Sequence, residues 1–296
     1  MPRRRRYLLL AIVAAIVAAI GMLVPSAFAK EHGSWINAIT ARTAQTEQAG
    51  VGGSASTDHA ASVVNVDFKG EFLGWAMRDS TGVLVGEKTT STSSTESMIK
   101  TWMVADYLRR AAEKGTTPSR SDLRRASEAI RWSDDDDTQV LYKANGGNAS
   151  VMRMIEMCGL RDTKVYDNWW SRTQMSPRDA VTLGECIANG IAAGKTWTPW
   201  LLNEMRNVEG TTAATEQWAT RGGGRWGIID GVPASMAGTV AIKNGWTSIG
   251  IDGNWHLSCL AIGDGWTMSV MMRYPSKLGL DYGAGVCRSV ASQLLQ

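Results

Sequence analysis

A serine and a lysine stand three residues apart at Ser97 and Lys100, and this spacing could support nucleophilic chemistry. On a helix it places both side chains on nearly the same face. A serine hydroxyl needs a neighbouring base at neutral pH, and a lysine whose pKa is lowered by desolvation can take its proton. The pair therefore predicts acyl transfer by a serine nucleophile. A surface serine beside a solvated lysine is the alternative that the pair alone leaves open.

The residues around this pair predict the helix that positions it. Apolar residues follow Ser97 at a helical spacing, and Ser93 with Glu96 forms the S-x-x-E pattern of a capping box. We therefore expect the helix to begin near Ser93, with N–H groups at its N-terminus available to an oxyanion. The apolar positions are Met98, Ile99, Trp102, Met103, Leu108 and Ala111.

The N-terminal residues 1–29 have the three parts of a secretory signal peptide. Arginines occupy positions 3–6, positions 7–24 carry no charge, and Ala27-Phe28-Ala29 matches a cleavage site. We expect cleavage after Ala29 and a secreted or cell-envelope protein. An uncleaved segment that anchors the chain in a membrane is the alternative. Residues 30–64 are rich in small and polar residues and are expected to form a flexible lead-in.

Charge and motifs argue against several classes of function. The chain has 31 basic and 28 acidic residues, and the basic excess lies in the signal segment, so no nucleic-acid surface is expected. The acids at 134–137 stand at a helix start, where they complement the helix dipole, so we expect no metal. His32, His59 and His256 lack the context of a Ser-His-Asp or zinc site. We expect no cofactor.

Four cysteines lie in the predicted mature part of the chain, and in an exported protein they favour two disulfides. Cys158 and Cys186 fall in the helical middle of the chain, whereas Cys259 and Cys287 fall in the C-terminal strand and helix. We therefore expect the pairs 158–186 and 259–287. Buried free thiols are the alternative.

Strand patterns lie at both ends of the chain, and helical patterns lie between them. This order predicts an α+β fold, in which an antiparallel five-stranded sheet is flanked by helices and carries an inserted all-helical lobe. We assign 65–115 and 216–296 to the sheet lobe and 116–215 to the helical lobe. The expected strands are 71–78, 83–87, 238–243, 256–262 and 267–273. The expected helices after the Ser97 helix are 121–131, 137–145, 149–157, 177–190, 199–207 and 282–295.

Two further motifs complete a constellation with Ser97 and Lys100. Ser133-Asp134-Asp135 precedes a helix, and Lys243-Asn244-Gly245 lies on the first C-terminal strand. The order of these S-x-x-K, S-D-N-like and K-T-G-like motifs resembles that of serine β-lactamases and penicillin-binding proteins, most closely class A β-lactamase-like serine hydrolases of actinobacterial type. The resemblance covers about residues 65–296, and the β-lactamase-like fold agrees with the predicted sheet and helical lobe.

The resemblance implies a catalytic role for four residues. Ser97 would be the acylated nucleophile, and Lys100 would take its proton. Ser133 would pass a proton to the leaving group. Lys243 would face a substrate carboxylate and help to lower the pKa of Lys100.

The resemblance also implies how a substrate is held. The backbone N–H groups of Ser97 and Trp246 would form an oxyanion hole, and Asp135, Asn244 and Gly245 would contact the substrate. Two of these positions depart from the family pattern. A carboxylate at Asp135 accepts hydrogen bonds but cannot donate them, and Asn244 replaces the usual hydroxyl residue, which should weaken recognition of a carboxylate.

The segment 166–170 departs most from the family pattern. Class A β-lactamases deacylate with a glutamate on this loop, and here the nearest acid is Asp167, which has a shorter side chain. An acyl-enzyme would therefore be long-lived. Trp170, Trp226 and Trp246 are the tryptophans expected to border the cleft.

These features predict an exported serine acyl-transfer hydrolase that deacylates slowly, as a penicillin-binding protein or esterase would. Its expected partner is a small-molecule or peptidoglycan-type acyl substrate, with membrane contact only through an uncleaved signal segment, and the protein is expected to be a monomer. One alternative is a catalytically silent cell-envelope binding protein on the same fold. The other is a true β-lactamase with an unrecognised deacylation acid.

Overall fold

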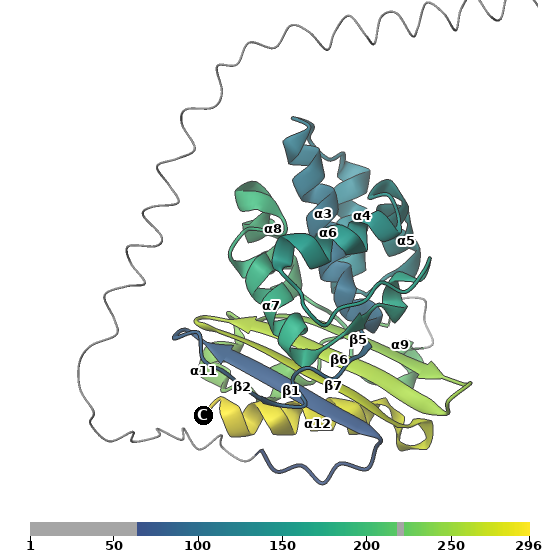
Figure 1. The fold of residues 1–296 in the computed structure, drawn as a ribbon, viewed down its shortest axis with the longest axis vertical. Coiled ribbons are helices and arrows are strands. Elements are labelled where there is room, and N and C mark those ends of the chain that lie inside the picture. Colours follow the sequence, from purple (N-terminus) through teal and green to yellow (C-terminus); the bar gives the residue numbers. More distant parts are fainter. Residues whose placement is uncertain (1–63, 218–221) are drawn as a thin grey trace, which may run out of the picture. The chain divides into compact units, whose positions relative to one another are not determined.

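The computed structural model describes residues 64–217 and 222–296, so the predicted signal segment 1–29 and nearly all of the lead-in 30–64 lie outside the described residues. The described chain has the predicted α+β fold, with a five-stranded antiparallel sheet in the order β2-β1-β7-β6-β5 (Figure 1). Its strands are β1 (Phe72–Asp79), β2 (Leu84–Glu87), β5 (Ala241–Ile249), β6 (Asn254–Gly263) and β7 (Trp266–Pro275).

The sheet joins the two ends of the described chain. Strand β1 pairs with β7 along its whole length, with Trp75 opposite Val270. Strand β5 is at the edge and pairs only with β6 among the described strands. Most residues of β6 and β7 are buried, as expected for strands covered on both faces.

Helices cover both faces of the sheet (Figure 1). Helix α12 (Gly279–Leu294) packs on one face against β6 and β7, and α7 (Pro177–Ala188) packs on the other against β1, β6 and β7. The other long helices gather on the side of α7. They are α3 (Lys100–Glu113), α4 (Arg120–Arg131), α5 (Asp135–Ala144), α6 (Asn148–Cys158) and α8 (Gly194–Arg206).

Short elements that the sequence did not predict connect these parts. Among them are a two-stranded sheet of β3 (Ser93–Ser94) and β4 (Gln174–Met175), and the single turns η1 (Glu96–Ile99) and η2 (Trp170–Arg172). The remainder are α9 (Ala214–Gln217), α10 (Ile228–Gly231), α11 (Ala234–Ala237) and η3 (Ser276–Leu278).

Both predicted disulfides are confirmed. Cys158 bonds to Cys186 and so ties the end of α6 to α7, and Cys259 bonds to Cys287 and ties β6 to α12. Each bridge closes a loop between elements that already pack together, and such a cross-link stabilises the fold by about 2–4 kcal/mol. The alternative of free thiols is excluded, because the described chain has no free cysteine.

The predicted capping box is wrong. Ser93 lies in β3 and makes no cap, and the first helical residues form the 3-10 turn η1 before α3 begins at Lys100. The carboxylate of Glu96 instead accepts hydrogen bonds from Ser94 Oγ and Thr247 Oγ1. A tertiary contact with β5 has thus taken the side chain that a local cap would need.

Candidate active site

The predicted nucleophile Ser97 lies in η1 and lines a cavity of about 410 Å³. Strand β5 passes close behind it. A Cβ added at Gly245 would stand 2.5 Å from the backbone nitrogens of both Ser97 and Met98. Only glycine permits this approach of strand to turn, so Gly245 serves to bring β5 against the nucleophile.

Four predicted residues meet beside Ser97 and form what we call the lysine cluster: Lys100, Ser133, Asp135 and Lys243. Ser133 Oγ accepts hydrogen bonds from Lys100 Nζ at 3.3 Å and from Lys243 Nζ at 2.9 Å. Lys100 Nζ also donates to Asp135 Oδ1 at 2.6 Å and to the backbone carbonyl of Ser133. The structure therefore brings the three motifs of the sequence together around one hydroxyl.

The hydrogen bonds of Lys100 differ in one respect from the predicted arrangement. A lysine ammonium has three donors, and here they go to Ser133 and Asp135. Among the described residues, no hydrogen bond joins Lys100 to the Ser97 hydroxyl. Hydrogen bonds of a catalytic base are often incomplete without substrate, so this arrangement leaves the predicted roles of Lys100 and Ser97 as a prediction.

Burial changes the acidity of both lysines. It lowers the pKa of Lys100, although the carboxylates of Asp135 and Asp134 oppose this. It lowers the pKa of Lys243 further, and the charge of Lys100 adds to that effect. Both side chains are fully buried, which shifts each amine toward its neutral form relative to a lysine in water. Burial, rather than the charge of Lys243, is the largest cause at Lys100.

Strand alternation decides which β5 side chains reach the site. Lys243, Gly245 and Thr247 face Ser97 and the helices, as their contacts show. Asn244 faces the other way, and its amide donates to the carbonyls of Gly224 at 2.8 Å and of Trp226 at 2.7 Å.

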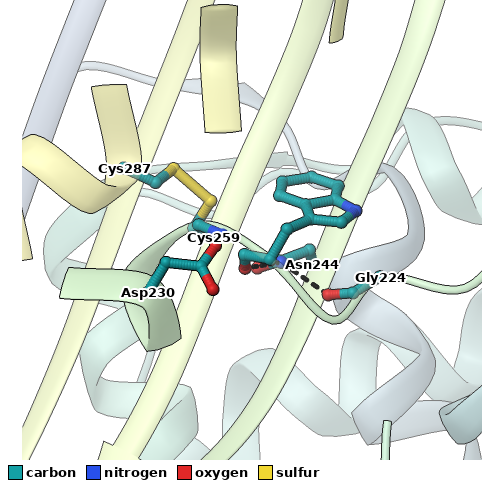
Figure 2. Close-up of a disulfide and its surroundings, with 7 residues drawn as sticks. Gly224, Asp230, Asn244, Cys259 and Cys287 are labelled. Carbon is teal, nitrogen blue, oxygen red and sulfur yellow. Dashed lines mark hydrogen bonds between the residues drawn. A yellow bond between two sulfur atoms is a disulfide. The ribbon is translucent and has the colours of Figure 1, made fainter. Parts of the chain in front are cut away.

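Figure 2 shows Asn244 on the side of the sheet that holds the Cys259–Cys287 disulfide. Asn244 is paired with Cys259 across the strands and is not among the residues that line the cavity. The structure therefore does not bring the predicted substrate contact at Asn244 to the nucleophile.

The tryptophans near the cavity take different positions. Trp246 lines the cavity, but its ring packs edge-on against Trp226 and its Nε1 donates to Gln217. Its backbone N–H, on the edge strand beside Ser97, remains the group assigned to the oxyanion hole. Trp226 is buried and does not line the cavity.

Trp170 occupies the place beside the predicted base. Its ring centroid lies 5.4 Å from Lys100 Nζ, and its Nε1 donates to Gln139. Asp167, the nearest acid of the 166–170 segment, accepts a hydrogen bond from Asn148 at 2.7 Å. The group beside Lys100 in this segment is therefore an aromatic ring, and the Asp167 carboxylate is engaged by Asn148.

A second polar cluster includes Glu96, the residue directly before Ser97. We call it the glutamate cluster, and its members are Glu96, Ser94, Thr247, His256 and Asp252. Ser94 Oγ contacts Glu96 Oε1 at 2.6 Å and His256 Nδ1 at 2.9 Å, and His256 Nε2 contacts Asp252 Oδ2 at 2.7 Å. Burial raises the pKa of Glu96, which the bonds from Ser94 and Thr247 partly oppose.

Sequence reasoning missed the glutamate cluster, which does contain a Ser-His-Asp chain. Ser94 is only 1% exposed, so its hydroxyl does not meet a substrate and the chain is not a second nucleophilic site. The one local signal was an acid directly before the nucleophile. Ser94 links this acid, Glu96, to His256, and that contact depends on the position of β6, which no short motif encodes.

Backbone strain concentrates around the cavity. Of the four described non-glycine residues with positive φ, three belong here: Glu96 at 47°, Ser133 at 58° and Asn168 at 55°. Each such conformation costs about 1–2 kcal/mol, and strain of this kind clusters at functional sites.

The residues 64–217 and 222–296 include no group of three or more His, Cys, Asp or Glu side chains placed to hold a metal ion. In the same residues, no helix is both long and apolar enough to span a bilayer.

No protein-family model matches the chain. Among curated proteins, the candidate lipoprotein LppW of Mycobacterium bovis and of Mycobacterium tuberculosis is 28% identical over 212 residues. The match covers 70% of this chain but only 62% of each relative.

Solved structures are similar to this chain along most of its length. They include PBP-A, with a TM-score of 0.61, 16% identity and coverage of 79% of this chain and 92% of that one. An ancestral class A β-lactamase matches with a TM-score of 0.58 and 15% identity, over 76% of this chain and 94% of that one. TLA-3 extended-spectrum β-lactamase matches with a TM-score of 0.61 and 15% identity, over 78% of this chain and 95% of that one.

The two disulfides are typical of a protein exported from the cytoplasm, and the similarity to a mycobacterial protein agrees with the actinobacterial type of the motifs. The described chain has the fold of the serine β-lactamase and penicillin-binding protein superfamily.

Proposed function

We propose that this protein is a serine acyl-transfer hydrolase that forms an acyl-enzyme readily and deacylates slowly. The observation that carries the proposal is the Ser133 hydroxyl held between Lys100 and Lys243, at 3.3 and 2.9 Å, beside the cavity that Ser97 lines. Two buried lysines with lowered pKa around one hydroxyl form a route for protons next to a nucleophile.

Each step of acylation has a residue to perform it. Neutral Lys100 takes the proton of Ser97 as Oγ attacks the acyl carbonyl. The N–H groups of Ser97 and Trp246 stabilise the oxyanion. Ser133 then gives its proton to the leaving group and is reprotonated from the lysines. Water finally cleaves the acyl-serine ester, which releases the acid and restores Ser97.

The second half of the reaction lacks a dedicated base. Trp170 covers Lys100 on the side of the 166–170 segment, and Asp167 is hydrogen-bonded to Asn148. General base catalysis contributes about 10²–10⁴ to such a step. We therefore expect the acyl-enzyme to persist.

A catalytically silent binding protein is the second candidate, and one contact favours it. The 2.6 Å ion pair with Asp135 stabilises the protonated form of Lys100, in which the amine cannot act as a base. In that case the cavity would hold an acyl ligand without reacting.

The test is the intact mass of the protein after incubation with benzylpenicillin, with Ser97→Ala as control. A stable adduct that Ser97→Ala abolishes supports the proposal. Penicillin consumed without an adduct would indicate turnover as a β-lactamase. If neither occurs, and simple activated esters also give no Ser97-dependent acylation, the silent binding protein is the better interpretation.

A further inference from the structure

Three hydrogen-bond donors at the cavity come from one short segment and are not used by the fold. Asn168 and Ser171 line the cavity, and Arg172 follows them at the end of η2. Within residues 64–217 and 222–296, no hydrogen bond or ion pair involves the Asn168 amide, the Ser171 hydroxyl or the Arg172 guanidinium. These three side chains are therefore available to a ligand.

The backbone that carries these donors is held against the strand that leads to the nucleophile. The Thr95 N–H donates to the Thr173 carbonyl at 2.9 Å, and Thr95 Oγ1 donates to the Ser171 carbonyl at 3.3 Å. The Gln174 amide donates to the Arg172 carbonyl at 2.8 Å. Because the backbone is already ordered, only the side chains lose freedom when a ligand binds.

The Arg172 guanidinium lies near the part of the cavity wall that Trp169 and Glu96 form. Its central carbon is 5.5 Å from the centroid of the Trp169 ring. Burial raises the pKa of Glu96, and the positive charge of Arg172 opposes that effect. Trp169 and Glu96 both line the cavity, whereas Arg172 is half-buried behind them. A ligand that extends along this wall therefore comes within reach of the guanidinium.

The acids near Arg172 leave its charge unpaired. Glu96 accepts its hydrogen bonds from two hydroxyls, and burial shifts it toward the neutral acid. Asp252 contacts His256 at 2.7 Å instead. Neither acid forms an ion pair with Arg172 within the described part of the chain, so the guanidinium keeps its full capacity to bind an anion.

The lysine cluster serves another part of the substrate. Under the proposed function Ser133 protonates the leaving group, so the leaving group lies beside Ser133. The exposed cavity acids Asp135 and Asp136 come from the first turn of α5, close to Ser133 in the chain. The charges that act on the two lysines are those of acids at the start of α5 and of the lysines themselves. The acyl part of the substrate, across the scissile bond, is the part that can extend toward Arg172.

We infer that Arg172 binds a carboxylate on the acyl part of the substrate. The inference rests on the proposed function, because it assigns the substrate class of the same cavity. A guanidinium matches a carboxylate with two parallel hydrogen bonds, and Ser171 and Asn168 offer neutral donors in the same segment. The chemistry is unchanged: Ser97 Oγ bonds to the acyl carbon, the bond to the leaving group breaks, and the leaving group gains a proton. The carboxylate stays on the acyl-enzyme.

The test compares three penicillins that differ only at the carbon between the phenyl ring and the side-chain amide. Carbenicillin has a carboxylate on this carbon, benzylpenicillin has hydrogen and ampicillin has an ammonium group. All three share the ring carboxylate, which belongs to the leaving-group part. The second-order rate constant for acylation of Ser97 is followed by intact mass. We expect carbenicillin to acylate about five-fold faster than benzylpenicillin, as one half-buried charge pair would give, and ampicillin to be the slowest.

Variants assign the preference to Arg172. Arg172→Gln should lower the ratio of the carbenicillin rate to the benzylpenicillin rate about five-fold. Arg172→Lys keeps the charge but not the planar fork, so it should retain part of the preference. Arg161→Gln, which changes an exposed arginine just after α6, is the matched control and should leave the ratio unchanged. The intrinsic reactivity of each penicillin cancels between parent and variant, and the benzylpenicillin rate reports that each variant is folded.

A second measurement separates this inference from the proposed function. Binding of carbenicillin and benzylpenicillin to Ser97→Ala protein, with and without Arg172→Gln, is measured by calorimetry. If no penicillin acylates the parent but Arg172→Gln removes a tighter binding of carbenicillin, the proposed function fails and the inference stands. If the penicillins acylate Ser97 and Arg172→Gln leaves the ratio of rates unchanged, the inference is overturned and the proposed function stands. If neither acylation nor a preference that depends on Arg172 is found, both fail.

Discussion

The two polar clusters near Ser97 each hold buried ionisable side chains, Lys100 and Lys243 in one and Glu96 in the other, yet they differ in origin and in charge. The lysine cluster contains two cations that lose affinity for protons, and its members come from motifs that the sequence displays. The glutamate cluster contains an acid that gains affinity for its proton, and no motif predicts it. Burial disfavours the charged form in both places, which shifts the lysines toward the neutral amine and the glutamate toward the neutral acid.

The contrast suggests a division of work. Under the proposed function the lysine cluster would supply proton transfer, whereas the glutamate cluster links η1 to β5 and β6 and would position Ser97 against the edge strand. Substituting a residue of the lysine cluster should abolish acylation of Ser97. Substituting a residue of the glutamate cluster should alter the position of Ser97 and the stability of the protein.

The largest effect is expected from Lys100→Met, which removes the base and keeps an apolar side chain in a buried place. The rate of Ser97 acylation should fall by about 10²–10⁴, measured as adduct formation by mass spectrometry. Ser94→Ala in the glutamate cluster is the matched variant and should reduce the rate by less than about ten-fold. Equal losses of acylation rate in both variants would contradict separate roles for the two clusters.

Asp135→Asn should change the pH dependence of Ser97 acylation and so test the role of the lysine cluster. The Asp135 carboxylate raises the pKa of Lys100 against the effect of burial, so its removal lowers that pKa further. The neutral base then persists to lower pH, and the acidic limb of the acylation rate should move to lower pH. On that limb we expect a gain of about three-fold, since Asp135 is largely exposed. A limb that moves to higher pH would contradict this assignment.

The smallest effect is expected from Glu96→Gln, and it concerns stability. A raised pKa means that the folded state keeps the Glu96 proton to higher pH than the unfolded state. Ionisation therefore costs the native protein stability as pH rises above the ordinary value of 4.5, and the cost is absent below it. Urea unfolding should show Glu96→Gln gaining on the parent protein, by about 1 kcal/mol, between acidic and neutral pH.

Lys243→Met provides the opposing control in the same assay. Its burial lowers the pKa of a base, so the cost of charging it is present at low pH and disappears as pH rises. The gain of that variant over the parent should therefore shrink with rising pH. If both variants showed the same slope, the contrast between the clusters would not hold.

Much of the site followed from local patterns. The expected strand 238–243 ended too early, since β5 runs over Ala241–Ile249. Its alternation puts Lys243, Gly245 and Thr247 on one face and Asn244 on the other, although the family resemblance placed Asn244 among the substrate contacts. The disulfide pairs also followed from sequence, because each joins neighbouring predicted elements. The capping box failed because Thr247, far along the chain, competes for Glu96.

The sequence by itself determined the fold class, the sheet built from both ends of the chain, and the disulfides. It also singled out four candidate catalytic residues, Ser97, Lys100, Ser133 and Lys243. These depend on periodicity and on short motifs, which are local properties. Only the tertiary structure decided that Trp170 lies beside Lys100, that Asp135 pairs with Lys100, and that Ser94 links Glu96 to His256. These contacts depend on the crossing of elements far apart in sequence, and burial at such crossings sets the charge of each group.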